Sequence, residues 1–84
     1  SDVTQAGLNV NNTYLQLVSS RKSREASEKN ADAAQTRFSA GLATPFEVAT
    51  ALQSLTSARL NELNATIRYI NAIADFDKKQ RVAG

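Results

Sequence analysis

Two pairs of acidic residues stand close enough in the sequence to raise the question of acid–base chemistry. They are Glu25 with Glu28, and Asp75 with Asp77. Neighbouring carboxylates can serve as general acid and general base, but both pairs lie in polar stretches with helical character, where they are ordinary solvated charges. The chain has no His or Cys, which excludes imidazole catalysis, thiol nucleophiles and zinc clusters. We therefore predict that the protein is not an enzyme and needs no metal or cofactor.

The balance of charge narrows the possible partners. Ten basic and eight acidic residues give a net charge of +2, and the charges alternate instead of forming a basic block with interleaved aromatic residues. The sequence therefore predicts no binding to nucleic acid. No apolar run approaches the roughly 18–20 residues of a membrane span, and the first residues do not form a signal peptide. If the protein acts at a membrane, we expect this piece to stand in water beside it.

A turn signal lies almost at the midpoint of the 84 residues. Gly41 suits the position just past a helix C-terminus, where the backbone turns left-handed. Thr44 can cap the next helix, Pro45 has the fixed φ of a first helical position, and Glu47 completes a T-x-x-E capping box. The elements expected are a helix over about 2–39, a tip turn over 40–44 and a helix over about 45–80.

The first expected helix has a sparse apolar stripe. Apolar residues recur at multiples of seven, with Arg24 in the one gap of the series: Val3, Val10, Leu17, Ala31 and Phe38. Four more thicken the stripe over the first half: Leu8, Tyr14, Leu15 and Val18. The middle of the helix is polar, and opposite charges stand four residues apart at Arg21/Glu25, Arg24/Glu28 and Glu25/Lys29. This polar stretch is either a solvated helix surface or a contact zone for a neighbouring subunit.

The second expected helix is more apolar and has two ridges. One ridge consists of Val48, Leu52 and Leu55, and the other of Leu60, Leu63, Ile67, Ile70 and Ala74, with Ala51, Ala58, Ala65 and Ala72 alongside. Such a broad face suits a helix that touches two neighbours. A lone pair of helices with Ala- and Ser-rich seams would be marginally stable. We therefore predict an all-α, coiled-coil-like hairpin that is a fragment of a longer chain, part of an oligomer, or both.

The residues around the tip form a longer ordered pattern. It runs R-F-x-A-G-L-A-T-P-F-E-V-x-x-A-x-x-x-L-x-x-A from Arg37 and continues later to A-T-I-R-Y-I-N-A-I-A. The set resembles the outer membrane efflux protein family, the TolC-type channel-tunnels, at Phe38, Gly41, Glu47, Val48, Ala51, Leu55, Ala58, Tyr69 and Ala72. The segment Tyr14-Leu15-Gln16-Leu17 also resembles the long helix that leads to the turn in this family. The resemblance therefore spans nearly the whole chain.

The resemblance implies a periplasmic α-hairpin from a longer channel protein. In this family three protomers join a β-barrel in the outer membrane of a Gram-negative bacterium to a long α-helical tunnel, so the chain would be a piece of a trimeric α-helical barrel. The hairpin turn lies at the periplasmic end, where the tunnel narrows and a periplasmic adaptor (membrane fusion) protein docks. Through the adaptor, the homotrimer would serve an inner-membrane pump in a tripartite system. The implied function is efflux or secretion.

The resemblance also assigns roles to single residues. Three residues fall in the turn that resembles the adaptor-docking site: Gly41, Leu42 and Ala43. Three others lie in the first turns of the second helix, where family members constrict the closed tunnel: Phe46, Glu47 and Thr50. Leu42 would offer an exposed apolar side chain to the adaptor. A simpler role stays open for two residues, since Gly41 can be a plain helix stop and Glu47 can serve the capping box alone.

The chain departs from the family pattern at two of these positions. Thr50 stands where Asp is common, so the expected constriction is a ring of Phe46 side chains instead of a ring of carboxylates. Ala43 stands where a charged residue can clamp the hairpin shut through an ion pair, which leaves Arg37 as the candidate latch. The alternative function is a freestanding helical hairpin that acts as an interaction or oligomerisation module.

Overall fold

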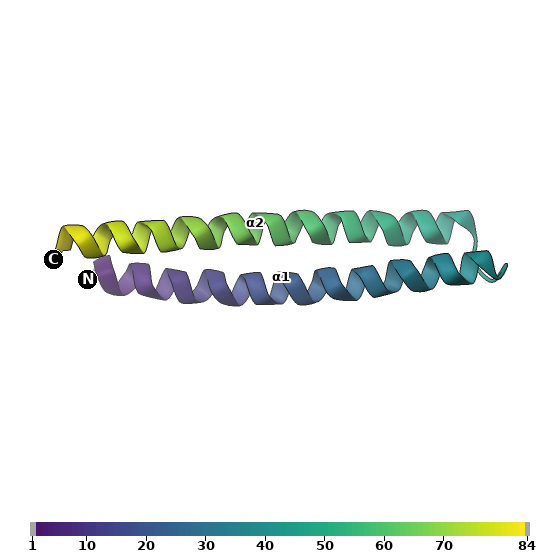
Figure 1. The fold of residues 1–84 in the computed structure, drawn as a ribbon, viewed down its shortest axis with the longest axis horizontal. Coiled ribbons are helices and arrows are strands. Elements are labelled where there is room, and N and C mark those ends of the chain that lie inside the picture. Colours follow the sequence, from purple (N-terminus) through teal and green to yellow (C-terminus); the bar gives the residue numbers. More distant parts are fainter. Residues whose placement is uncertain (1, 84) are drawn as a thin grey trace.

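The protein forms one extended hairpin of two long antiparallel helices (Figure 1). The computed structural model describes residues 2–83, and the side chains of residues 2–81. Helix α1 comprises Asp2–Ser39 and helix α2 comprises Pro45–Ala83. The turn forms one end of a molecule 64 Å long and 13 Å wide, and the start of α1 and the end of α2 lie at the other. The predicted all-α hairpin is confirmed, and α2 continues past its expected end at residue 80.

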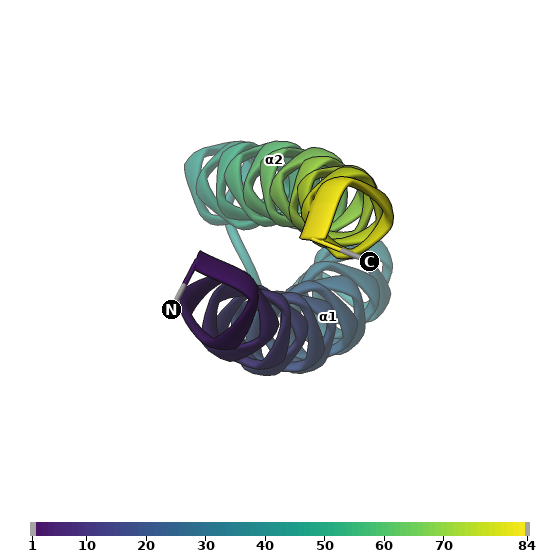
Figure 2. The same cartoon turned by 90° about the vertical axis from the view of Figure 1, so that its left-hand side faces the viewer.

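The two helices pack along one continuous seam that follows a heptad repeat. In α1 a buried or half-buried residue recurs alternately every three and four positions: Ala6, Val10, Thr13, Leu17, Ser20, Arg24, Ser27, Ala31 and Ala34. The same alternation runs along α2: Val48, Ala51, Leu55, Ala58, Glu62, Ala65, Tyr69, Ala72, Phe76 and Lys79. This spacing keeps one stripe facing the partner while two helices wind around each other. The winding is visible when the hairpin is viewed end-on (Figure 2).

Small side chains dominate the seam. Four alanines are buried at every seventh position of α2: Ala51, Ala58, Ala65 and Ala72. Because the spacing between packed helices depends on the side chains at the contact, small residues permit a close approach of the two backbones. The core cluster beside the turn is built in this way and consists of Ala31, Ala34, Ala51 and Leu55, with Val48 packed against it. The hairpin therefore relies on close packing of small groups more than on large apolar side chains.

The apolar stripe expected in α1 coincides with the seam only in part. Leu17 and Ala31 are buried as expected, but several other members of the stripe are exposed: Leu8, Tyr14, Leu15 and Phe38. Thr13 is buried in their place, and its hydroxyl donates to the carbonyl oxygens of Asn9 and Val10 at 2.8 and 3.0 Å. A small hydroxyl whose hydrogen bonds are made within its own helix fits this narrow seam better than a bulky apolar side chain.

The second apolar ridge expected in α2 lies on the side of the helix away from α1. Its large side chains are all exposed: Leu60, Leu63, Ile67 and Ile70. The row of alanines faces α1 instead. We call the four exposed residues Leu60, Leu63, Ile67 and Ile70 the outer face of α2. Within residues 2–83, neither helix has a stretch long and apolar enough to cross a membrane.

Candidate functional site at the hairpin tip

Helix α1 ends at the tip in a Schellman motif. Gly41 has a φ of +77°, and its N–H donates to the carbonyl oxygen of Phe38 at 3.0 Å, while the N–H of Leu42 donates to that of Arg37 at 2.7 Å. These bonds provide partners for carbonyl groups that the helix end leaves unpaired. A Cβ atom at position 41 would meet nothing within 4 Å. The left-handed backbone, and not a lack of space, is therefore the reason for glycine.

Helix α2 begins with a threonine cap. Oγ1 of Thr44 accepts a hydrogen bond from the N–H of Glu47 at 3.2 Å, and the Thr44 carbonyl oxygen accepts one from the N–H of Val48 at 3.3 Å. Pro45 is the first helical residue, as predicted. The threonine half of the capping box is thus formed. For these described residues, no return bond joins the Glu47 carboxylate to the Thr44 N–H, and Glu47 is exposed.

Two large apolar side chains project into solvent from this fixed turn. Leu42 is 75% exposed and Phe46 is 78% exposed. Ala43, which follows Leu42 in the sequence, is half-buried. Thr50 is exposed one turn beyond Phe46 along α2. Scattered apolar residues are common on protein surfaces, but here both project from the same end of an elongated molecule. The tip therefore presents two exposed apolar side chains on a backbone that its own hydrogen bonds hold in place.

A shallow groove of about 230 Å³ lies beside the tip. Its lining comprises Asn30, Ala34, Arg37, Phe46, Glu47, Thr50, Ala51 and Ser54. The structure thus brings together the three residues predicted for the constriction and places Arg37, the predicted latch, in the same groove. The turn residues Gly41, Leu42 and Ala43 lie outside it. In the described part of the chain, no ion pair joins Arg37 to Glu47, so the role of Arg37 as a latch stays a prediction.

The groove at the tip opens into a row of shallow grooves along one edge of the hairpin. Successive grooves share lining residues: first Thr50 and Ser54, then Asn61, then Arg68. Small polar side chains such as Asn, Ser and Thr dominate their walls. This edge is therefore hollowed along much of its length.

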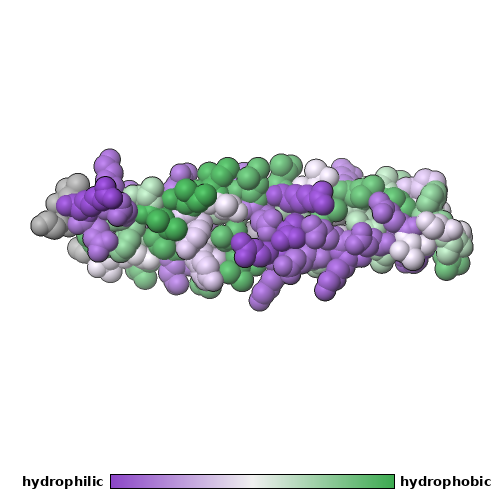
Figure 3. Space-filling view, in the orientation of Figure 1, coloured by the Kyte–Doolittle hydropathy of each residue, from purple (hydrophilic) through white to green (hydrophobic). Residues whose placement is uncertain are grey.

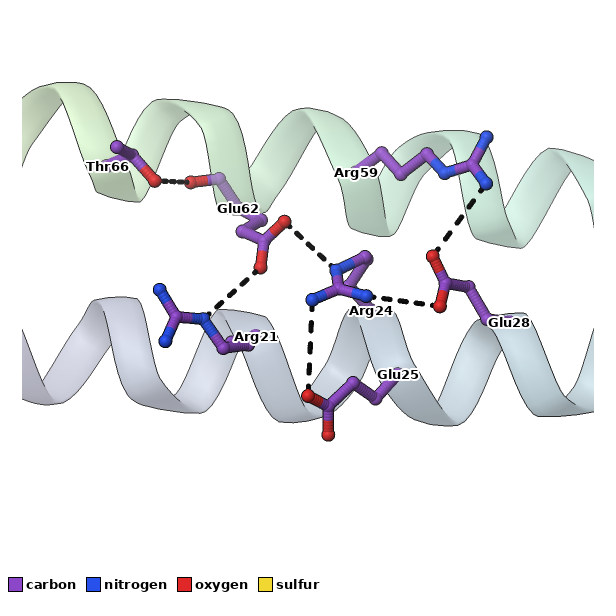
Figure 4. Close-up of polar contacts among 7 residues, drawn as sticks. All are labelled: Arg21, Arg24, Glu25, Glu28, Arg59, Glu62 and Thr66. Carbon is purple, nitrogen blue, oxygen red and sulfur yellow. Dashed lines mark hydrogen bonds and ion pairs between the residues drawn. The ribbon is translucent and has the colours of Figure 1, made fainter.

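A cluster of ion pairs joins the two helices near the middle of the hairpin (Figure 4). Nε of Arg24 donates to Oε1 of Glu62 at 3.0 Å, and Nη1 of Arg24 donates to Oε2 of Glu28 at 3.1 Å. Arg21 approaches the other oxygen of Glu62 at 3.7 Å, and Arg59 approaches Glu28 at 3.8 Å. Three ion pairs of the cluster therefore link α1 to α2, two at Glu62 and one at Arg59.

Arg24 is the centre of this cluster and the only arginine in the seam of α1. The hydrogen bond to Glu62 raises the pKa of the Arg24 guanidinium above its ordinary value, partial desolvation opposes that rise, and Glu28 adds to it. The group therefore stays charged. The space-filling view shows hydrophilic residues gathered over the middle of the hairpin (Figure 3), where this cluster lies. The polar middle of α1 is thus more than a solvated surface, because one of its arginines packs across the seam.

The ion pairs that join the two helices in this cluster were not predicted from the sequence. Of the pairs expected within α1, Arg24/Glu28 is formed, but Arg21 reaches Glu62 instead of Glu25, and Glu25 approaches Arg24 at 4.0 Å. A signal was available in the heptad positions. Arg24 fills the gap in the apolar series of α1, and Glu62 stands midway between Leu55 and Tyr69, seven residues from each.

Comparisons with models of known protein families, with curated proteins and with solved structures found no match to this chain. The function is therefore inferred from the resemblance in the sequence and from the geometry of the tip.

Proposed function

We propose that this hairpin is a periplasmic tunnel segment of an outer membrane efflux or secretion channel. In the full-length protein three copies would line the tunnel, with the tip at the end where a periplasmic adaptor docks and with an inner-membrane pump reached through that adaptor. The tip would also form the constriction of the closed tunnel. This piece would stand in the periplasm of a Gram-negative bacterium, below the outer membrane.

The observation that carries the proposal is the exposure of Leu42 on a turn fixed by its own hydrogen bonds. Binding to such a turn costs little conformational entropy, because the backbone of the turn is already held in place. One exposed leucine per copy is a small contact. Repetition in a trimer would multiply it, because linked sites gain affinity through effective concentration.

Phe46 supports the second part of the proposal, the constriction. Its ring is exposed at the first turn of α2 and lines the tip groove together with Glu47 and Thr50. In a trimer, three such rings at one level would narrow the tunnel with apolar surface, which opposes the passage of hydrated solutes. Thr50 is uncharged, so it would add no electrostatic barrier at that level.

The test uses two substitutions in the full-length channel protein. Leu42→Asp places an unpaired charge in the apolar contact with the adaptor, which small interfaces tolerate poorly. We expect adaptor binding to weaken at least tenfold, a loss of about 1.4 kcal/mol, and export to stop while trimers still reach the outer membrane. Leu42→Met is the matched control and should export normally.

Phe46→Ala should act differently, because it removes a large ring from each subunit without touching the turn. We expect higher single-channel conductance with adaptor binding unchanged, and Phe46→Tyr should behave as the parent does. If Leu42→Asp exports normally and Phe46→Ala leaves conductance unchanged, the tip has neither role and the hairpin is a scaffold.

A second candidate function is a freestanding oligomerisation hairpin. The observation that favours it is the outer face of α2, which is apolar, exposed and away from the tip. This function predicts that the 84-residue chain associates with itself and that substitutions at Leu42 leave this association unchanged. The channel function predicts instead that Leu42 is needed to bind a different protein, the adaptor.

A further inference from the structure

The row of grooves that begins at the tip follows one edge of the hairpin, which we call the grooved edge. Along α2 its lining repeats every seven residues, from Glu47 through Ser54 and Asn61 to Arg68. Residues seven positions apart lie on one line of a helix that winds around a partner, because a coiled coil has 3.5 residues per turn. Arg68 therefore lies on the line that begins at the tip with Glu47.

Arg68 stands where two of these grooves meet. It shares a groove of about 300 Å³ with Gln16 and Asn61, and the next groove, of about 320 Å³, with Asn9 and Asn71. Amide side chains carry N–H groups that can donate hydrogen bonds, and a guanidinium group can bind a carboxylate or a phosphate through two parallel hydrogen bonds. An anion that approaches Arg68 therefore meets further donors on both sides of it.

The charge of Arg68 is not balanced by an ion pair. The lining of the four grooves contains three other charged residues. Arg37 and Glu47 have opposite charges and share the tip groove, and Asp75 forms an ion pair with Lys79 at 3.4 Å. Arg68 is exposed and forms no ion pair in the part of the chain whose side chains are described. The grooved edge thus carries one surplus positive charge.

We propose that Arg68 attracts anions inside the tunnel, so that the channel passes anionic solutes in preference to cationic ones. This inference rests on the proposed function, in which the tip groove with Glu47 and Thr50 forms the constriction. Arg68 lies about 30 Å along α2 from Glu47. A two-stranded coiled coil completes one turn in about 150 Å, so the grooved edge turns by only about a fifth of a circle over this distance. Arg68 therefore stays on the side of the hairpin that faces the tunnel.

Three copies of the chain would place three Arg68 side chains at one level of the tunnel. Rings of arginine or lysine side chains are one way in which pores select anions. This ring is separate from the constriction, because it lies well beyond the first turns of α2. It would act on the solutes that pass through the tunnel and not on the docking of the adaptor.

The other side of α2 offers no such site. Arg59 precedes Asn61 by two residues, and two residues turn an α-helix by about 200°, so Arg59 lies on the side away from the grooved edge. Its charge is paired with Glu28 at 3.8 Å. Leu52 and Ile73 lie on the same line of α2 as Arg59, at intervals of seven and fourteen residues, and both are exposed and apolar. Arg59 is therefore a matched control for Arg68.

Reversal potentials of the full-length channel in a planar bilayer test the inference, with KCl at different concentrations on the two sides. Arg68→Gln should lower the permeability of chloride relative to potassium by about twofold or more, because it removes three charges from one level of the pore. Arg68→Glu should lower this ratio further, and Arg68→Lys should behave as the parent does. Arg59→Gln should leave the ratio unchanged. The effect of Arg68→Gln should shrink as the KCl concentration rises, since salt screens an exposed charge.

The possible results separate this inference from the proposed function. A pore with the same permeability ratio in the parent and in both Arg68→Gln and Arg68→Glu would overturn the anion site and leave the channel function intact. An equal shift in Arg59→Gln would also overturn it, because the effect would then not depend on the grooved edge. A full-length protein that forms no pore in the bilayer would overturn the channel function, and the anion site with it.

Discussion

The tip and the seam of this hairpin are stabilised in opposite ways. At the tip, hydrogen bonds between residues no more than five positions apart fix the backbone, and the large side chains Leu42 and Phe46 are left in solvent. Along the seam, contacts between residues far apart in the sequence hold the helices together, and the side chains involved are mostly small. The difference shows that local hydrogen bonds can fix a backbone without burying side chains, whereas packing fixes two helices only by burying the side chains at their contact.

We expect the largest loss of stability from a substitution in the seam. Leu55 is 8% exposed and belongs to the core cluster beside the turn. Leu55→Ala should lower the free energy of unfolding by about 2–5 kcal/mol, because it removes buried methyl groups and leaves a cavity. Leu52→Ala, on an exposed position one turn away, is the matched control and should cost clearly less. Urea denaturation followed by circular dichroism measures both, and equal losses would mean that the seam is misplaced.

We expect a smaller loss of stability from a substitution at the tip. Gly41→Ala should lower the free energy of unfolding by about 1–2 kcal/mol, because alanine is strained at the positive φ of this position. The added methyl group meets no other atom, so the loss measures the backbone alone. Thermal denaturation gives the value. If Gly41→Ala is as stable as the parent, the tip is not held in the Schellman geometry.

The same substitution in α1 should have the opposite sign. Gly7 lies inside α1, where a Cβ atom would contact the ring of Phe76 at an ordinary 3.7 Å. Gly7→Ala should raise the free energy of unfolding by about 0.4–1 kcal/mol, because it restricts the unfolded chain without strain in the helix. A rise in the thermal midpoint is the expected reading, and a fall would show that α1 and α2 approach more closely there than the structure indicates.

The contrast also explains how much could be predicted from the sequence. Gly41, Thr44 and Pro45 act on their immediate neighbours, so the turn and the helix ends followed from short motifs. The partner of Arg24 could not be found in this way, because Glu62 lies 38 residues away and only the register of the two helices brings it near.

The burial of side chains was the part predicted least well. Large residues such as Leu60 and Ile67 attract notice in a sequence, yet the close packing of the helices gives the seam to Ala58 and Ala65 instead. Hydrophobicity alone therefore could not show which face of α2 packs against α1. The repeat of alanine at every seventh residue was the signal that indicates the correct face.

Photo-cross-linking from position 42 in living cells tests directly whether the tip docks on a periplasmic adaptor. A photoreactive amino acid replaces Leu42 in the full-length protein, another replaces the exposed Lys22 as a control, and mass spectrometry identifies the adducts. We expect position 42 to capture a periplasmic adaptor protein and position 22 not to capture it. Adducts from position 42 that contain only this chain itself, or an adaptor captured equally from both positions, would contradict the assignment of docking to the tip.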